Sequence, residues 1–255
     1  LSAEFMSSGW DIKQLFRTMV TSHTYRQSSR VTPQLLEADP ANRLLTRGAR
    51  FRMPAWMIRD QALAASGLLV ERRGGNPVNS YQPEGIWAEA TFGKKKYNRG
   101  KGEDLYRRSL YSFWRRIAAP PMFFDNPSRE VCSVKPGRTN TPLHALSTLN
   151  DVTYVEAARA LAARAAREAG PAVADRLRHA FELVLARAPR NDELAILERG
   201  FDRALVRFTA DPPAAASFLA VGESPRNSEL PEAEHAALAS ACLGLLNLDE
   251  ALTRE

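Results

Sequence analysis

The second half of the chain constrains the fold most strongly, because its apolar residues recur at helical spacing between clear helix boundaries. Asn150 or Asp151 can cap a helix that Gly170 and Pro171 end. Asn191, followed by two acidic residues, starts a further helix. Repeated stripes of this kind predict an array of amphipathic helices. The expected apolar faces are Val173, Leu177, Ala180, Phe181 and Val184; Leu194, Leu197, Phe201, Leu205 and Phe208; and Leu238, Cys242, Leu245 and Leu246.

The first half predicts helices over residues 11–23, 41–50, 55–69 and 104–116. Between about 72 and 142, turn-forming residues recur too often for one long helix, so we expect an irregular, loop-rich central segment, with a short strand or two before residue 102. Long loops in compact domains tend to be functional or mobile. We therefore predict a mainly α fold, with residues 1–255 forming a single domain that ends in a helical array.

Charge and aromatic residues are distributed unevenly along the chain. Residues 1–150 contain 23 Lys/Arg against 12 Asp/Glu, whereas residues 151–255 contain 12 against 17. A basic, aromatic-rich half beside an acidic, Ala-rich half can present a surface that binds polyanions. Alternatively, the two halves pack on each other and much of the field cancels, which is the interpretation we favour.

Several functional classes lack their sequence signatures. There is no phosphate-binding glycine loop, no dinucleotide-binding glycine motif and no hydrolase nucleophile elbow. The four His are scattered, so we predict no metal site and no cofactor in this chain. Cys132 and Cys242 lack zinc or haem spacing, and either one disulfide or two free thiols is compatible with the sequence. The longest uncharged stretch has 14 residues (235–248), too short to span a membrane.

A lysine-rich loop and an aromatic–arginine segment are the candidate binding residues. The loop over residues 94–101 can hold phosphate or sulfate groups, although a solvated loop has the same composition. The segment over 106–116 alternates aromatic side chains with arginines, which suits either internal cation–π packing or stacking on sugars and bases. The predicted binding residues are Trp87, Lys94, Lys95, Lys96, Tyr97, Arg99, Lys101, Arg107, Arg108, Arg115 and Arg116.

Three carboxylates are candidate catalytic groups: Asp60, Asp125 and Glu130. Acid–base catalysis needs positioned proton carriers, so this hypothesis requires two of them to meet in one cleft. The neighbouring Arg59 and Asp60 point to different sides of a helix, so we expect each to pair across to another segment rather than with the other, and we interpret this as buried structural ion pairing.

Ordered motifs along the whole chain give it a family resemblance. It resembles the planctomycete-specific domain of unknown function number 1553, which follows cytochrome c-like domains in large planctomycete proteins. The matching segments are 4–5, 9–13, SHTYRQSS at 22–29, DPANRLL at 39–45, IRD at 58–60, SGLL at 66–69, YQPEGIW at 81–87, RRSLY at 107–111, 124–125, 129–130, TNTPL at 139–143, LND at 149–151 and LLNLDE at 245–250.

The sequence departs from that family in three places. Trp56 stands where the family usually has an acidic residue, residues 135–137 replace a more Arg-rich stretch, and His144 stands where Gln is usual. If the missing acid were a binding or catalytic group, this member would be inactive. We interpret Trp56 instead as a packing substitution.

The resemblance implies a setting and no established activity. It implies a C-terminal module of a longer, extracytoplasmic protein whose upstream region carries haem c and serves as this module's partner. We expect a non-catalytic binding or assembly module, with anionic polysaccharide as the candidate ligand. The alternative is part of a polysaccharide-acting or redox-coupled enzyme whose active site needs the upstream region. An exported family makes nucleic acid an improbable partner.

Overall fold

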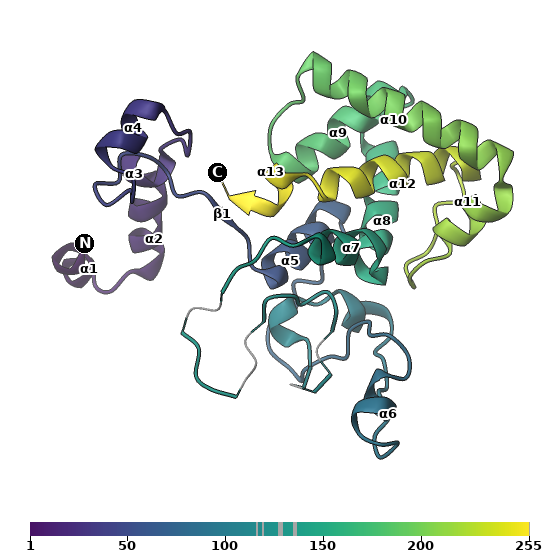
Figure 1. Cartoon of the computed structure of the whole chain (residues 1–255), viewed down its shortest axis with the longest axis horizontal. Helices are drawn as coiled ribbons and strands as arrows, with labels where there is room; N and C mark the ends of the chain where they lie inside the picture. The colour runs from purple at the N-terminus through teal and green to yellow at the C-terminus, as the bar shows by residue number, and fades with distance from the viewer. Residues whose placement is uncertain (116, 119, 127–129, 135–136, 255) are drawn as a thin grey trace. The chain divides into compact units, whose positions relative to one another are not determined.

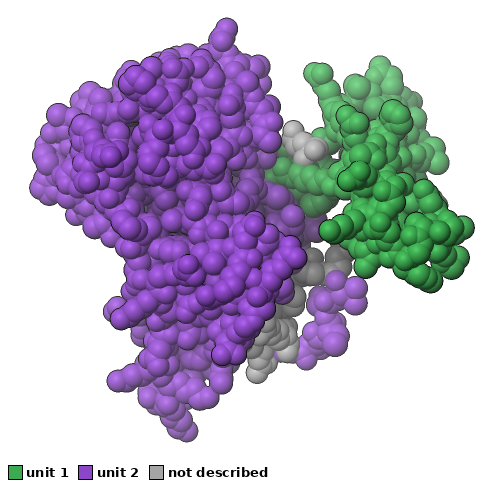
Figure 2. Space-filling model, turned by 180° about the vertical axis from the view of Figure 1, so that it is seen from behind, with its two compact units in different colours: residues 1–51, 253–255 green, residues 52–252 purple. Residues whose placement is uncertain are grey.

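The computed structural model describes residues 1–115, 117–118, 120–126, 130–134 and 137–254, which are mainly α-helical (Figure 1). The predicted mainly α class is therefore confirmed. The chain divides into two compact units, coloured separately in Figure 2: unit 1 comprises Leu1–Phe51 with the C-terminal residues from Thr253, and unit 2 comprises Arg52–Leu252. The short strands β1 (Phe51–Arg52) and β2 (Thr253–Arg254) pair in a two-stranded sheet.

Unit 1 contains α1 (Ser2–Ser7), α2 (Ile12–Thr21), α3 (His23–Arg26) and α4 (Pro33–Ala38). The prediction of a helix near residues 11–23 is confirmed, since the Asp11 carboxylate caps α2 by accepting the Gln14 N–H.

The helix predicted over residues 41–50 is wrong, because this segment is a loop. The buried Asp39 carboxylate accepts the backbone N–H groups of Arg43 and Leu44. In a helix these N–H groups would donate to backbone carbonyls, so their bonds to the carboxylate favour turns instead. Asn42 and Leu45 have positive φ angles of 51° and 55°, incompatible with a continuous helix.

Unit 2 is built around a cluster of helices that matches the predicted C-terminal array. α12 (Glu232–Leu246, yellow in Figure 1) packs against α8 (Val152–Glu168), α9 (Val173–Leu185), α10 (Asn191–Ala210) and α11 (Pro212–Leu219). α12 is apolar on nearly all sides, as expected of a central helix. Buried alanines such as Ala157, Ala162 and Ala236 line the helices of this core. The unit also contains α7 (Pro142–Asn150) and α13 (Asp249–Leu252).

A buried polar network attaches the loop after α11 to α8. The Glu156 carboxylate, 1% exposed, accepts hydrogen bonds from the Tyr106 hydroxyl (2.8 Å) and the Ser224 N–H (2.6 Å). The Arg159 guanidinium donates to the Ser224 carbonyl (2.7 Å). Gly222 has a φ of 88°, and a Cβ there would lie 2.2 Å from the Glu156 Cδ. Glycine is therefore required where this loop crosses the carboxylate.

The central segment is loop-rich, as predicted, and rests on α5 (Ala55–Ser66), which packs on α8. It contains α6 (Ile86–Ala90) and two short 3₁₀ helices, η1 (Gly102–Tyr106) and η2 (Ser109–Tyr111). Isolated β-bridges join Val70 to Arg107 and Val78 to Ser112.

The helix predicted over residues 104–116 is wrong. The backbone of this segment makes its hydrogen bonds to other segments instead: the carbonyls of Leu105 and Arg107 accept from Arg59, and the Tyr106 carbonyl accepts the Val70 N–H. Tertiary partners thus replace the helical ladder. Arg116, part of this prediction, lies outside the described residues.

Candidate functional site

A pocket of about 400 Å³ in unit 2 collects part of the predicted binding surface. Four of the predicted residues line it: Trp87, Lys96, Tyr97 and Arg99. We call this cavity the basic pocket; its other lining residues are Gln82, Pro83, Glu84, Gly85 and Ala88. Its volume falls within the range of small-molecule sites.

The turn after α6 folds the lysine-rich loop back onto Trp87. The Thr91 hydroxyl donates to the Trp87 carbonyl (2.5 Å) and accepts the Lys95 N–H (3.0 Å). The Tyr97 ring then stacks on the Trp87 ring with centroids 5.4 Å apart. The Tyr97 hydroxyl donates to the Ser80 carbonyl (2.7 Å), and burial raises the pKa of Tyr97 to about 12, so this side chain stays neutral.

Trp87 forms the wall of the basic pocket rather than an open platform. It is 5% exposed, and its ring also stacks on Phe113 (6.0 Å). Its indole N–H donates to the Gln82 side chain (2.5 Å), and the Arg115 guanidinium lies 5.7 Å from the ring centroid. The ring contacts hold the pocket's shape, and only a small part of the indole is left for a ligand.

The charged side chains at the basic pocket are accessible. Lys96 and Arg99 are exposed, and Arg99 pairs with Glu223 while lying 5.4 Å from the Tyr81 ring centroid. Lys94, Lys95 and Lys101 are exposed on the same loop, outside the pocket lining. Within the part of the chain that the structure describes, Lys94, Lys95 and Lys96 form no ion pair, so their charges are available to a ligand.

Two of the predicted arginines lie away from the basic pocket. Arg107 is 1% exposed and its guanidinium donates to the carbonyls of Arg72 (2.9 Å), Gly74 (2.6 Å) and Asn76 (3.2 Å). It also stacks 3.9 Å from the Tyr111 centroid, so its role in this structure is to hold the 72–76 loop. Arg108 pairs with Glu71 at 3.5 Å and lines a different cavity.

Asp60 lies in that second cavity, which we call the tryptophan pocket. It has a volume of about 410 Å³ and is lined by Trp56, Asp60, Arg108, Ser109, Leu110, Ser112, Trp114, Phe123 and Asn126. One oxygen of Asp60, Oδ1, accepts the Ser109 N–H (2.8 Å) and hydroxyl (2.7 Å). Arg59 lies 3.4 Å from the same oxygen.

Arg59 holds the segment that carries this cavity. It is 1% exposed and donates to the carbonyls of Leu105 (2.8 Å) and Arg107 (2.9 Å) and to the Ser109 hydroxyl (3.2 Å). Burial lowers the pKa of Arg59, and the Asp60 carboxylate opposes that shift. Both charges thus contact the 105–109 segment, as expected, but they also contact each other, which was not expected.

The other two candidate carboxylates lie elsewhere. Asp125 accepts the Thr139 N–H and hydroxyl, both at 2.7 Å, and lies 3.6 Å from the His144 Nε2. His144 stacks on Phe124 at 4.2 Å, so this group closes a loop onto α7. Glu130 is exposed. Neither Asp125 nor Glu130 lines the tryptophan pocket, and Asp60 is the carboxylate among its described lining residues.

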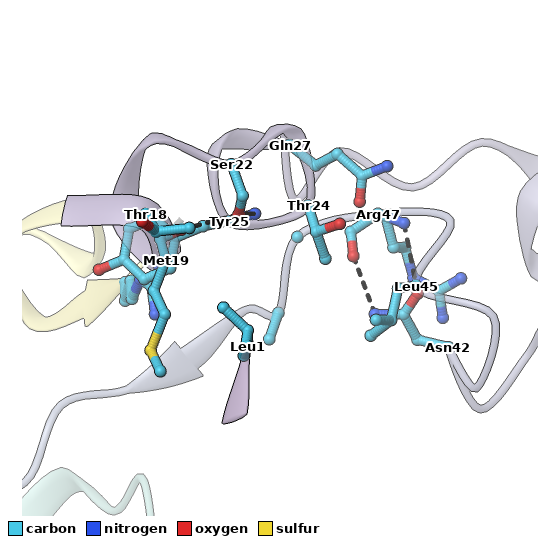
Figure 3. Close-up of a pocket in the computed structure, with 13 residues that line it drawn as sticks. Leu1, Thr18, Met19, Ser22, Thr24, Tyr25, Gln27, Asn42, Leu45 and Arg47 are labelled. Carbon is cyan, nitrogen blue, oxygen red and sulfur yellow. Dashed lines mark hydrogen bonds between the residues drawn. The ribbon is translucent and has the colours of Figure 1, made fainter. Parts of the chain in front are cut away.

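Unit 1 contains a further pocket, of about 640 Å³, lined by residues of the 22–29 and 39–45 motifs (Figure 3). Its polar groups largely satisfy one another. The Asn42 amide bonds both backbone groups of Arg47, and the Arg47 guanidinium donates to the carbonyls of Asp39 and Pro40. Ser22 accepts the Tyr25 N–H. These contacts indicate a structural role for the motifs.

Sequence reasoning named neither Trp114 nor Asn126 as a binding residue, although Trp114 lies in the aromatic–arginine segment, and it interpreted Trp56 as a packing residue. Trp56 and Asp60 are four residues apart on α5, so they share a face of that helix. This spacing was a usable signal. Trp114 carried the aromatic–arginine signal of its segment, whereas nothing in the sequence connected Asn126 with these residues.

Cys132 is exposed and Cys242 is buried, and both are free thiols. Over residues 1–115, 117–118, 120–126, 130–134 and 137–254, no group of three or more His, Cys, Asp or Glu side chains is placed to hold a metal ion. No helix in that part of the chain is long and apolar enough to cross a membrane.

The described residues are mainly helical, and among them Asp60, Asp125 and Glu130 do not line one common pocket. The chain belongs to the family described as PSD1, protein of unknown function (DUF1553), whose model matches residues 1–201. No curated protein and no solved structure matches the chain.

Proposed function

We propose that this domain is a non-catalytic binding module that recognises an anionic glycan at the basic pocket. The observation that carries the proposal is the placement of Lys96, Tyr97 and Arg99 around one cavity, with Lys94 and Lys95 exposed beside it and forming no ion pair with a described residue. Sulfate or carboxylate groups suit this set, because ammonium and guanidinium groups bind them through charge-assisted hydrogen bonds.

The exposed lysines and arginine at the basic pocket set the affinity that we expect for an anionic glycan. Exposed ion pairs contribute about 0.2–1 kcal/mol each, so three or four of them give weak, salt-dependent affinity unless the pocket adds further contacts. Glu84 lines the same pocket and disfavours an anion close to it. Because Arg99 already pairs with Glu223, we expect the anionic group to sit at Lys96 and the remainder of the sugar to lie over Tyr97.

The cellular setting forms part of the same proposal. The resemblance supports a C-terminal module of an extracytoplasmic, cytochrome c-linked planctomycete protein. In that setting haem c belongs to the upstream region, which is the module's natural partner for assembly.

Calorimetric titration tests the binding proposal. A sulfated oligosaccharide, its desulfated counterpart and duplex DNA are titrated at two salt concentrations against the wild type, Lys96→Ala and Lys13→Ala. Lys13 is an exposed lysine in unit 1, so its variant has the same change in net charge. We expect selective binding of the sulfated glycan that Lys96→Ala weakens and Lys13→Ala preserves. Equal, salt-abolished binding of both polyanions by all three proteins would contradict the proposal.

The enzyme alternative needs more than this structure provides. Glycoside hydrolysis generally uses two carboxylates flanking the bond. Among the described residues that line the tryptophan pocket, Asp60 is the one carboxylate, so this alternative draws its second carboxylate from the upstream region.

A further inference from the structure

An extended segment separates the basic pocket from the tryptophan pocket. Ser112 and Trp114 line the tryptophan pocket, whereas Phe113 stacks on Trp87 and Arg115 lies over the same ring. Successive side chains of an extended chain point to opposite sides. Because Trp87 is the wall of the basic pocket, the two cavities lie on opposite sides of residues 112–115 and can be occupied independently.

The tryptophan pocket combines an open aromatic face with a few polar groups. Trp56 is 39% exposed and makes no ring contact with the residues that the structure describes. Trp114 and Phe123 add apolar surface, and Asn126 supplies an amide. The Ser112 hydroxyl is buried and has no hydrogen-bond partner among the described residues. Concave sites with this balance of apolar walls and placed polar groups are typical of small-ligand binding.

The charges in the tryptophan pocket are already balanced within the protein. Asp60 has Arg59 beside it at 3.4 Å, and Arg108 has Glu71 at 3.5 Å. A ligand with a net charge would therefore meet no unpaired counter-charge. The hydrogen bonds of Asp60 with Ser109 use Oδ1, which leaves Oδ2 to accept from a ligand hydroxyl. These features favour a neutral ligand with hydroxyl donors and an apolar face.

We infer that the tryptophan pocket is a second binding site, which holds one neutral pyranose residue of a saccharide. The sugar ring stacks on the indole of Trp56, and its hydroxyls donate to Asp60 and bond with Asn126. This inference does not rest on the function proposed for the basic pocket, because the two sites use different residues and ligands of different charge.

Titration with neutral oligosaccharides of glucose, xylose, mannose and galactose tests the inference on the full chain. We expect saturable binding of at least one of them that changes little with salt concentration. Trp56→Ala removes the stacking surface, and the loss of one buried aromatic contact corresponds to roughly tenfold weaker binding. Trp56→Phe keeps an aromatic face and should restore most of the affinity. Asp60→Asn should also weaken binding.

Two control variants make the result specific. Trp10→Ala removes another exposed tryptophan, in unit 1, and Lys96→Ala alters the basic pocket; both should leave neutral-sugar binding unchanged. Absence of binding by all four oligosaccharides at millimolar concentration overturns the inference. So does binding that Trp56→Ala leaves intact while the protein remains folded.

Discussion

Replacing Arg59 by Ala should destabilise unit 2 severely, because this buried guanidinium joins α5 to the central segment. It is 1% exposed and donates to the carbonyls of Leu105 and Arg107 and to the Ser109 hydroxyl. Loss of the guanidinium leaves two buried carbonyls without this hydrogen-bond donor, and each unsatisfied carbonyl costs about 1–3 kcal/mol. It also leaves Asp60 without its cation. Breaking a fully buried ion pair costs about 3–5 kcal/mol; because the Asp60 side chain is 27% exposed, we expect a loss near the lower end of that range.

Urea unfolding at neutral pH, followed by circular dichroism, measures the effect. Arg59→Lys keeps the positive charge but not the guanidinium's several donors, so its free energy of unfolding should fall less than that of Arg59→Ala. Arg203, an exposed arginine on α10, provides the matched control, and Arg203→Ala should stay within about 0.5 kcal/mol of the wild type. A loss below about 1 kcal/mol for Arg59→Ala would refute the argument, since the two carbonyls would then have other partners.

Three further predictions concern buried groups elsewhere. Gly222→Ala places a Cβ against Glu156 at a positive φ, so it should lower the free energy of unfolding, measured with urea, by at least about 2 kcal/mol. An unchanged free energy of unfolding would mean that the loop can move away from Glu156. In the native protein a thiol reagent should modify Cys132 and spare Cys242, whose pKa burial raises to about 12; two reactive thiols before unfolding would contradict this. Burial lowers the pKa of His235 below its usual 6.5, so the unfolded chain binds more protons below that pH. Stability should therefore fall as the pH drops from about 7.5 to 5, and less so in His235→Gln; equal pH dependence in both proteins would contradict this assignment.

The helices of the second half could be predicted because their signals are local. The Asp151 cap and the stripe from Val173 to Val184 both lie within the elements that they define, and α8 and α9 form as expected. The segment over 104–116 has helical spacing too, yet its carbonyls bond to Arg59, about 50 residues away in the sequence. A single sequence does not show such distant partners, and they override local propensity.

The two pockets also differ in whether their residues are close together in the sequence. Lys96, Tyr97 and Arg99 are neighbours in the sequence, so their composition alone indicated a cationic, aromatic surface. The tryptophan pocket is assembled from α5, the 108–114 segment and the loop before residue 127. No short window of the sequence contains its residues, although the Trp56 and Asp60 spacing on α5 marks one wall.

The most direct test of the two-site account uses the four tryptophan indole N–H signals as reporters in one NMR titration. Trp87 reports on the basic pocket, Trp56 and Trp114 on the tryptophan pocket, and Trp10, in unit 1, serves as the internal control. A sulfated oligosaccharide should shift the Trp87 signal, and a neutral oligosaccharide should shift those of Trp56 and Trp114. Equal shifts of all four signals, or no shift with either ligand, would contradict the account.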